Sequence, residues 1–206
     1  MNRRNVLKSL SLSIGGVVAA PSLMQLLTSC EEGSSLNWSP LFLDKTQGFV
    51  VENLVAIILP SGKNIGALDV NVPQFIDLVL KDLMTQKEQH DFLKGANIFN
   101  EKFKTLFKKT VLEGVKKDYL EILSLYFNIQ KEKQQEILEF CNSDIDQVEN
   151  KDLFYLYNFL IFVRHYTLFG FYNSKKVGTE ILNYNPIPGS YEACINIDDA
   201  GNISSS

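Results

Sequence analysis

The amino-acid sequence predicts an all-α protein, with a single helical-bundle domain after an N-terminal signal. Apolar residues recur every three or four positions along most of the chain, which is the pattern of a helix with one buried side. No segment shows the strict alternation of polar and apolar residues that marks a half-buried strand. Hydrophobic residues make up 45% of the 206 residues, a composition typical of a packed domain.

The first 29 residues have the layout of an export signal. They contain Arg3, Arg4 and Lys8 but no acid, and an apolar run extends from about residue 10 to residue 27. This run is too short, and too rich in Gly and Ser, for a membrane span of about 20 apolar residues. Residues 3–8 (RRNVLK) resemble the twin-arginine motif of a route that exports folded proteins. We expect export to depend on Arg3, Arg4, Leu7 and Lys8.

A cysteine stands directly after the apolar run. Residues 27–30 (LTSC) resemble a bacterial lipobox, in which the cysteine is lipidated and becomes the first residue of the mature protein. An ordinary buried cysteine is the alternative. Several acyl chains on one residue would anchor the protein stably, because each buried CH₂ contributes about 0.8 kcal/mol. We therefore expect lipidation of Cys30, a flexible tether over residues 30–45, and a place in the bacterial cell envelope on the periplasmic or extracellular face of a membrane.

The first helices of the body are marked by turn residues and caps. Residues 46–59 form an apolar-rich helix that stops at Pro60, and the polar, Gly-containing residues 61–72 form a surface loop. Pro73 suits the first position of the next helix. Thr85 and Glu88 have the spacing of a capping box. The helix that they begin carries one apolar stripe, formed by Phe92, Ala96, Phe99, Phe103 and Phe107.

The later helices lead to the most apolar segment of the body. Residues 116–127 form an amphipathic helix, and Asn128 is expected to cap a polar helix over 129–141. Asp152 is expected to cap a helix over 153–172, which is apolar on nearly all sides and therefore suits the centre of a bundle. A membrane span is the alternative for this segment, but Asn158, Arg164 and His165 interrupt it. We expect one helical domain over 46–196 and a disordered tail over 197–206.

The charge and the missing motifs argue against several functions. Without residues 1–29 the chain has 17 basic and 24 acidic side chains, which does not suit nucleic-acid binding. It lacks the HxxxH, CxxC, HExxH and CxxCH spacings of metal and haem sites. It also lacks the GxGxxG, GxxxxGK[ST] and GxSxG motifs. His90 is expected on a charged, exposed face, and His165 either buried with a hydrogen-bond partner or in contact with another protein. We expect no catalytic residue, metal or cofactor in this chain.

Two cysteines remain if Cys30 carries lipid. Cys141 and Cys194 could pair outside the cytoplasm, and closing a loop of roughly 53 residues would contribute about 4 kcal/mol. Alternatively Cys141 is a core residue, and Cys194 is free or bridges to another chain. The sequence leaves these alternatives open.

Two stretches of the body resemble a known family. The first is residues 55–60 (VAIILP), followed after a loop by 70–77 (VNVPQFID). The second is residues 167–174 (TLFGFYNS), running on through 178–180 (GTE) and 182–189 (LNYNPIPG) to Tyr191 and Cys194. Together they resemble the gluconate 2-dehydrogenase subunit 3 family over about residues 50–194. The chain departs from the family's usual residues at Ala56, Asn185 and Ala193.

The resemblance implies an accessory role. Members of this family are small helical subunits with a twin-arginine signal, and they accompany a large flavoprotein of the glucose-methanol-choline type that oxidises sugars, sugar acids and related alcohols. The small subunit aids maturation and export, FAD and catalysis belong to the large subunit, and a cytochrome c often takes the electrons. Two alternatives stay open for this chain. It could be an independent envelope lipoprotein that binds a small ligand or protein, or an enzyme that uses His165, Arg164 or Cys194.

The loop over residues 184–194 suits docking to a partner. Two prolines fix φ and remove backbone donors, and a following glycine permits a turn, so the loop is stiff and loses little entropy on binding. Tyrosine rings suit interfaces. The alternative is that the loop wraps its own bundle. The residues expected to bind the partner are Tyr184, Pro186, Pro188, Gly189 and Tyr191.

Overall fold

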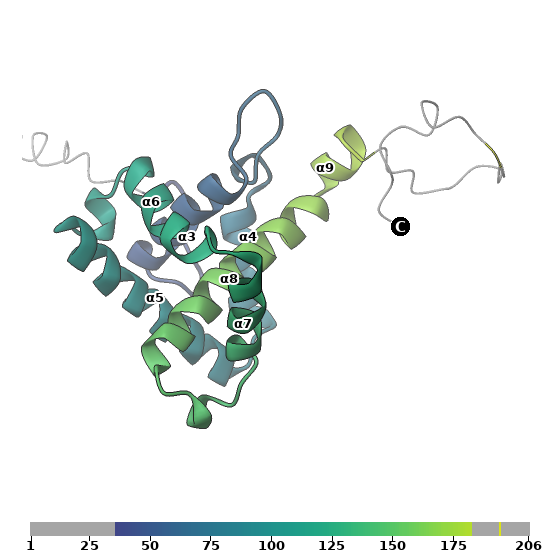
Figure 1. Ribbon diagram of the computed structural model, residues 1–206. Coiled ribbons are helices and arrows are strands. Elements are labelled where there is room, and N and C mark those ends of the chain that lie inside the picture. Colours follow the sequence, from purple (N-terminus) through teal and green to yellow (C-terminus); the bar gives the residue numbers. More distant parts are fainter. Residues whose placement is uncertain (1–35, 183–193, 195–206) are drawn as a thin grey trace, which may run out of the picture. The chain divides into compact units, whose positions relative to one another are not determined.

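The computed structural model describes residues 36–182 and residue 194, and this part of the chain is all α (Figure 1). It contains no strand, which confirms the predicted fold class. The chain divides into two compact units, residues 1–35 and residues 36–206, and the described helices belong to the second. These are α3 (Lys45–Ile58), α4 (Val72–Asp82), α5 (Gln86–Phe107), α6 (Lys116–Phe127), α7 (Lys131–Cys141), α8 (Lys151–Tyr172) and α9 (Lys175–Glu180), with the short 3₁₀ helices η1 (Leu68–Val70), η2 (Val111–Glu113) and η3 (Ile145–Gln147). The predicted tail over 197–206 lies outside the described residues.

The predicted start of α5 is confirmed, and α4 begins at Val72, one residue before the predicted start at Pro73. Pro73 lies in the first turn of α4, where its missing N–H costs nothing. Asn71, just before it, takes the left-handed conformation with φ of 56°. At α5 the Thr85 N–H donates to the Glu88 carboxylate (2.8 Å), and the Glu88 N–H donates to the Thr85 hydroxyl (3.3 Å). The hydroxyl and backbone N–H of Thr85 hydrogen-bond this carboxylate and lower the pKa of Glu88.

Two predicted caps are wrong by two residues. Asn128 ends α6 rather than beginning α7, because its N–H donates to the carbonyl of Ser124 (3.0 Å). Gln130 precedes α7 instead. At α8 the capping oxygen belongs to Asn150, which accepts from the N–H of Leu153 (3.0 Å). Asp152 lies in the first turn, where its negative charge still favours the positive end of the helix dipole.

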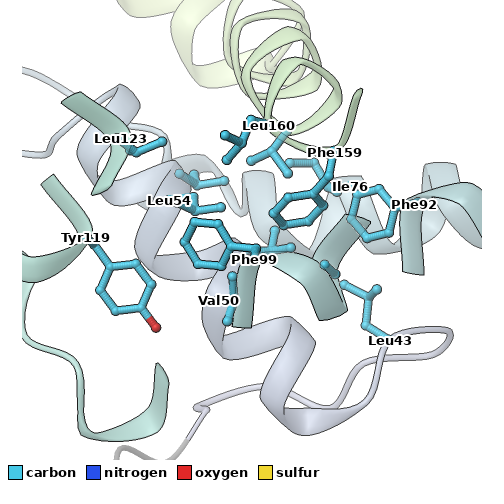
Figure 2. Close-up of a cluster of buried hydrophobic side chains, with 14 of the residues drawn as sticks. Leu43, Val50, Leu54, Ile76, Phe92, Phe99, Tyr119, Leu123, Phe159 and Leu160 are labelled. Carbon is cyan, nitrogen blue, oxygen red and sulfur yellow. The ribbon is translucent and has the colours of Figure 1, made fainter. Parts of the chain in front are cut away.

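The central position predicted for α8 is confirmed. It packs most extensively against α5 and also contacts α3, α4, α7 and α9. The two long helices approach closely at Gly95, where a Cβ would overlap the backbone oxygen of Tyr155. Figure 2 shows the core beside this crossing, in which the rings of Phe92 and Phe159 meet edge to face with centroids 5.0 Å apart. No helix in the described part of the chain is long and apolar enough to cross a membrane.

Residues 38–43, which precede the predicted helical domain, are hydrogen-bonded to its helices. The buried carboxylate of Asp77 in α4 accepts from the backbone N–H groups of Leu41 (2.6 Å), Phe42 (3.2 Å) and Leu43 (2.9 Å). The indole N–H of Trp38 donates to Glu52 in α3 (2.7 Å). Residues 36–44, which the sequence assigns to the tether, are therefore held on the domain. The buried core of the described residues runs from Leu43 to Val177.

Candidate docking surface

Aromatic side chains gather where α4 packs on the C-terminal half of α8. We define the aromatic surface as Phe75 and Leu78 of α4 together with His165, Tyr166, Phe169 and Tyr172 of α8. Phe169 is 49% exposed and Tyr172 is 50% exposed. His165, Phe169 and Tyr172 are spaced by four and three residues, so they share one side of α8. Clustered, exposed aromatic side chains are typical of protein interfaces.

The rings of this surface are held by one another. Phe75 stacks on Phe169, with centroids 6.2 Å apart and planes inclined by 23°, and its ring lies 6.4 Å from that of Tyr166. His165 lies nearly parallel to Phe169, at 6.3 Å and 15°. A contact network of this kind fixes the side-chain positions before a partner arrives, so little rotamer entropy remains to be lost on binding.

Gly170 allows α4 and α8 to approach at this place. A Cβ added there would lie 2.6 Å from the ring of Phe75, closer than any side chain tolerates. The ring of Phe75 therefore occupies the space that a side chain at residue 170 would need. Phe75 and Gly170 come from the two stretches that carry the family resemblance, which lie far apart in the sequence and meet only in the fold.

The aromatic surface explains why α8 is apolar on all sides. One side is buried in the core, through residues such as Leu160 and Val163. The opposite side of its C-terminal half, with Phe169 and Tyr172, remains exposed. The sequence pattern predicts the buried side of α8 but not the exposed apolar side, because an apolar residue in a sequence is the same whether it faces a core or an interface.

A groove lies between α6, α7 and α8. This groove has a volume of about 260 Å³. The rings of Tyr126 and Tyr157 meet edge to face on its wall, 5.6 Å apart, and burial raises the pKa of both. Arg164 lies at the groove and is exposed. The lining residues are Tyr126, Phe127, Ile129, Gln134, Ile137, Leu138, Tyr157, Ile161 and Arg164.

Metal-binding side chains do not gather in the part of the chain that the structure describes. In residues 36–182 and 194, no three His, Cys, Asp or Glu side chains lie close enough together to hold a metal ion. The carboxylates with lowered pKa values serve local structure. The N–H of Gly66 and the hydroxyl of Ser61 hydrogen-bond Asp69 and lower its pKa. Hydrogen bonds from Thr85 lower the pKa of Glu88 at the start of α5.

Most of the predicted site residues fall outside the described part of the chain. These are Cys30, the export residues Arg3, Arg4, Leu7 and Lys8, and the docking residues Tyr184, Pro186, Pro188, Gly189 and Tyr191. Their predicted roles remain predictions.

The remaining predicted residues are described. Cys141 is a half-buried free thiol whose pKa is raised by burial to about 11, and Cys194 is an exposed free thiol. His90 is exposed, as predicted. His165 is also exposed, so it is not a buried histidine, and its contact with another protein remains a prediction. Arg164, beside it, is exposed too.

Phe75 and Phe169 of the aromatic surface, and Asp77, which binds residues 41–43, are not among the residues predicted from the sequence. All three lie inside the stretches that carry the family resemblance, and this resemblance was the signal in the sequence that could have indicated them. The residue types alone gave no such signal, because aromatic residues in helices are more often core residues.

Comparison with known proteins points to the same stretches. A family model described as Gluconate 2-dehydrogenase subunit 3 matches residues 45–189. This range contains all of the described α-helices, α3 to α9, and both halves of the aromatic surface. No curated protein and no solved structure matches the chain.

Proposed function

The chain belongs to the gluconate 2-dehydrogenase subunit 3 family, and on that premise we propose that it is the non-catalytic small subunit of a membrane-associated, FAD-dependent dehydrogenase of sugars or sugar acids. In this proposal FAD and the catalytic residues belong to a large flavoprotein subunit of the glucose-methanol-choline type, and a cytochrome c accepts the electrons. The small subunit aids maturation of the flavoprotein. Its twin-arginine signal directs export, and the lipid on Cys30 anchors the complex.

One observation carries the proposed mode of binding. The two stretches that resemble the family meet at Phe75, Phe169 and Gly170, and there they form an exposed surface of rings. Residues that served only the core would leave no such surface. We infer that the flavoprotein docks on the aromatic surface, with the loop over 184–191 adding contacts.

A matched pair of variants tests the docking surface. The tagged protein, purified from a bacterium that makes it, should bring with it a larger FAD-containing polypeptide. Phe169→Ser should weaken this binding by about 30-fold, the effect of losing one interface hot spot. Leu125→Ser removes a similarly exposed apolar side chain of α6 and should leave the binding unchanged. Repeated recovery of the tagged protein alone, or equal binding by the two variants, would count against the proposal.

The export role has a separate test. Deletion of this protein should leave the flavoprotein in the cytoplasm, and Cys30→Ser should release the complex from the membrane without abolishing export. A flavoprotein that reaches the envelope normally in the deletion strain would refute the export role. Sugar oxidation by purified chain that is free of flavoprotein, and lost in His165→Ala, would refute the non-catalytic role.

A second candidate function rests on the groove between α6, α7 and α8. An independent lipoprotein that binds a small apolar ligand would use this hollow, with Arg164 placed for a negatively charged group. This candidate predicts that Leu138→Trp, which would fill the groove, abolishes ligand binding, and that deletion of the protein leaves sugar oxidation unchanged.

A further inference from the structure

The basic side chains of the chain are concentrated in one segment. Residues 102–120 contain six lysines and only two acids, Glu113 and Asp118. The rest of residues 30–206 contains 11 basic and 22 acidic side chains. A segment with a net charge of +4 therefore stands in a chain that is otherwise strongly acidic. We call this segment the basic end.

The fold brings the parts of the basic end close together, because the rings of Phe103 in α5 and Tyr119 in α6 meet with centroids 4.9 Å apart. The basic end consists of the C-terminal part of α5, η2 and the N-terminal part of α6, which lie side by side (Figure 1). Lys109 pairs with Asp118, at 2.6 Å. Among the residues that the structure describes, the other ion pair is Lys151 with Asp146, far along the chain. Five lysines of the basic end are exposed: Lys102, Lys104, Lys108, Lys116 and Lys117.

The two acids of this segment are occupied by local contacts. The Glu113 carboxylate accepts from the N–H (2.7 Å) and the hydroxyl (2.8 Å) of Thr110. The Asp118 carboxylate accepts from the N–H of Val115 (2.8 Å) and from Lys109. Both acids thus hold the turns around η2 by hydrogen bonds, and Lys109 is the lysine of this segment for which the described residues show a salt bridge.

Aliphatic side chains project between the lysines. Leu106 is 48% exposed, Val115 57% and Leu120 52%. Lys102 precedes Leu106 by four residues in α5, and Lys116 precedes Leu120 by four residues in α6, so each leucine shares a helix side with a lysine. The neighbouring Phe103, Val111 and Tyr119 are buried in the core, which fixes the backbone below.

We propose that the basic end is a lipid-binding surface that takes the anionic headgroups of a bilayer. Lysine ammonium groups would lie among the phosphates, and the aliphatic side chains would enter the interface between headgroups and acyl chains. The composition favours lipid over a protein partner. Protein interfaces are rich in Arg and aromatic residues and poor in Lys, whereas residues 102–120 have no Arg and no exposed aromatic side chain.

This surface is distinct from the aromatic surface in position and in chemistry. The proposal depends neither on a flavoprotein partner nor on lipid at Cys30. It would give the domain a second attachment to the membrane beside the anchor, and so set which side of the bundle faces the bilayer.

Vesicle binding tests the proposal. The chain 36–206 is used, because these residues form a separate unit, and circular dichroism verifies that its helices form. Sedimentation with vesicles of phosphatidylcholine is compared with vesicles that also contain phosphatidylglycerol. Binding should require the anionic lipid and should fall as salt rises from about 0.1 M to about 0.5 M, since salt screens exposed charges.

Charge-reversal variants locate the surface. Replacement of Lys104, Lys108, Lys116 and Lys117 by Glu should weaken binding to the anionic vesicles by about 100-fold. The matched control replaces Lys63, Lys81, Lys87 and Lys175 by Glu, which changes the net charge equally and should weaken binding by less than about threefold. Leu106→Ser with Leu120→Ser keeps the charge and should weaken binding by about tenfold.

Three results would overturn the proposal. The first is equal binding to both kinds of vesicle, or binding to neither. The second is an equal loss in the control variant, which would indicate a general charge effect. The third is normal vesicle binding by the basic-end variant together with lost flavoprotein binding, which would assign this surface to an acidic protein partner.

Discussion

The aromatic surface and the basic end are both exposed and partly apolar, yet they are built in opposite ways. In the aromatic surface, Phe75, Phe169 and His165 pack against one another on two helices, so the rings have little freedom. At the basic end, single aliphatic side chains stand among lysines with long flexible stems. Fixed rings suit a partner with a defined shape. Separated aliphatic and cationic groups suit a fluid, negatively charged layer.

The contrast teaches that exposure of apolar side chains does not by itself identify a partner. What distinguishes the two surfaces is how far their side chains are fixed beforehand and which charges surround them. The two should therefore respond independently to mutation.

The largest effect is expected for Gly170→Val, which should disrupt the aromatic surface and leave the basic end intact. The new side chain would enter the space of the Phe75 ring and displace that ring, so we expect a loss of about 2 kcal/mol in the free energy of unfolding. Flavoprotein binding should be lost and vesicle binding kept. Denaturant unfolding and both binding assays measure these outcomes.

Gly62→Val is the control for this variant, because a Cβ at Gly62 would contact nothing within 4 Å. It should leave stability and both binding activities unchanged. Loss of vesicle binding in Gly170→Val would show that the two surfaces are coupled.

An intermediate effect is expected for Tyr119→Phe, which weakens the support of the basic end. The buried Tyr119 hydroxyl donates to the carbonyl of Val111 in η2 (2.8 Å), and burial and the nearby charge of Asp118 raise the pKa of Tyr119. Loss of this hydrogen bond should cost about 1 kcal/mol of unfolding free energy. Vesicle binding should weaken and flavoprotein binding stay normal. In Tyr172→Phe, where the ring is exposed, unfolding should match that of the natural protein.

The smallest effect is expected from pH. Hydrogen bonds from Lys109 and from the N–H of Val115 lower the pKa of Asp118, and the N–H and hydroxyl of Thr110 lower that of Glu113. Because these pKa values are lower in the folded state, the stabilisation is complete above the unfolded values of 3.8 and 4.5 and is lost as pH falls through the folded values.

Melting temperature measured against pH tests this prediction. The double variant Asp118→Asn, Glu113→Gln should melt slightly below the natural protein at pH 6, and the gap should close on acidification below about pH 4. Since the variant also removes two negative charges from the basic end, it should bind anionic vesicles more tightly. A gap that widened at low pH would contradict the assignment of these two carboxylates as stabilising when ionised.

Much of the helical structure could be predicted from the sequence, because its signals are local. Apolar residues at helical spacing predict α5 and α6, and the capping box of Thr85 and Glu88 predicts the start of α5. The caps at α7 and α8 were misplaced, since several neighbouring polar side chains are able to cap and the backbone geometry selects one of them.

The sequence by itself determined the all-α class, the order of the helices and the segregation of charge into residues 102–120, because periodicity and charge can be read along the chain. Only the tertiary structure decided which apolar residues stay exposed. Phe75 and Phe169 meet only because Gly170 lets two helices approach, and Asp77 binds residues 41–43 only after α4 has packed. Contacts between residues distant in sequence depend on the packing of whole helices, which no local pattern specifies.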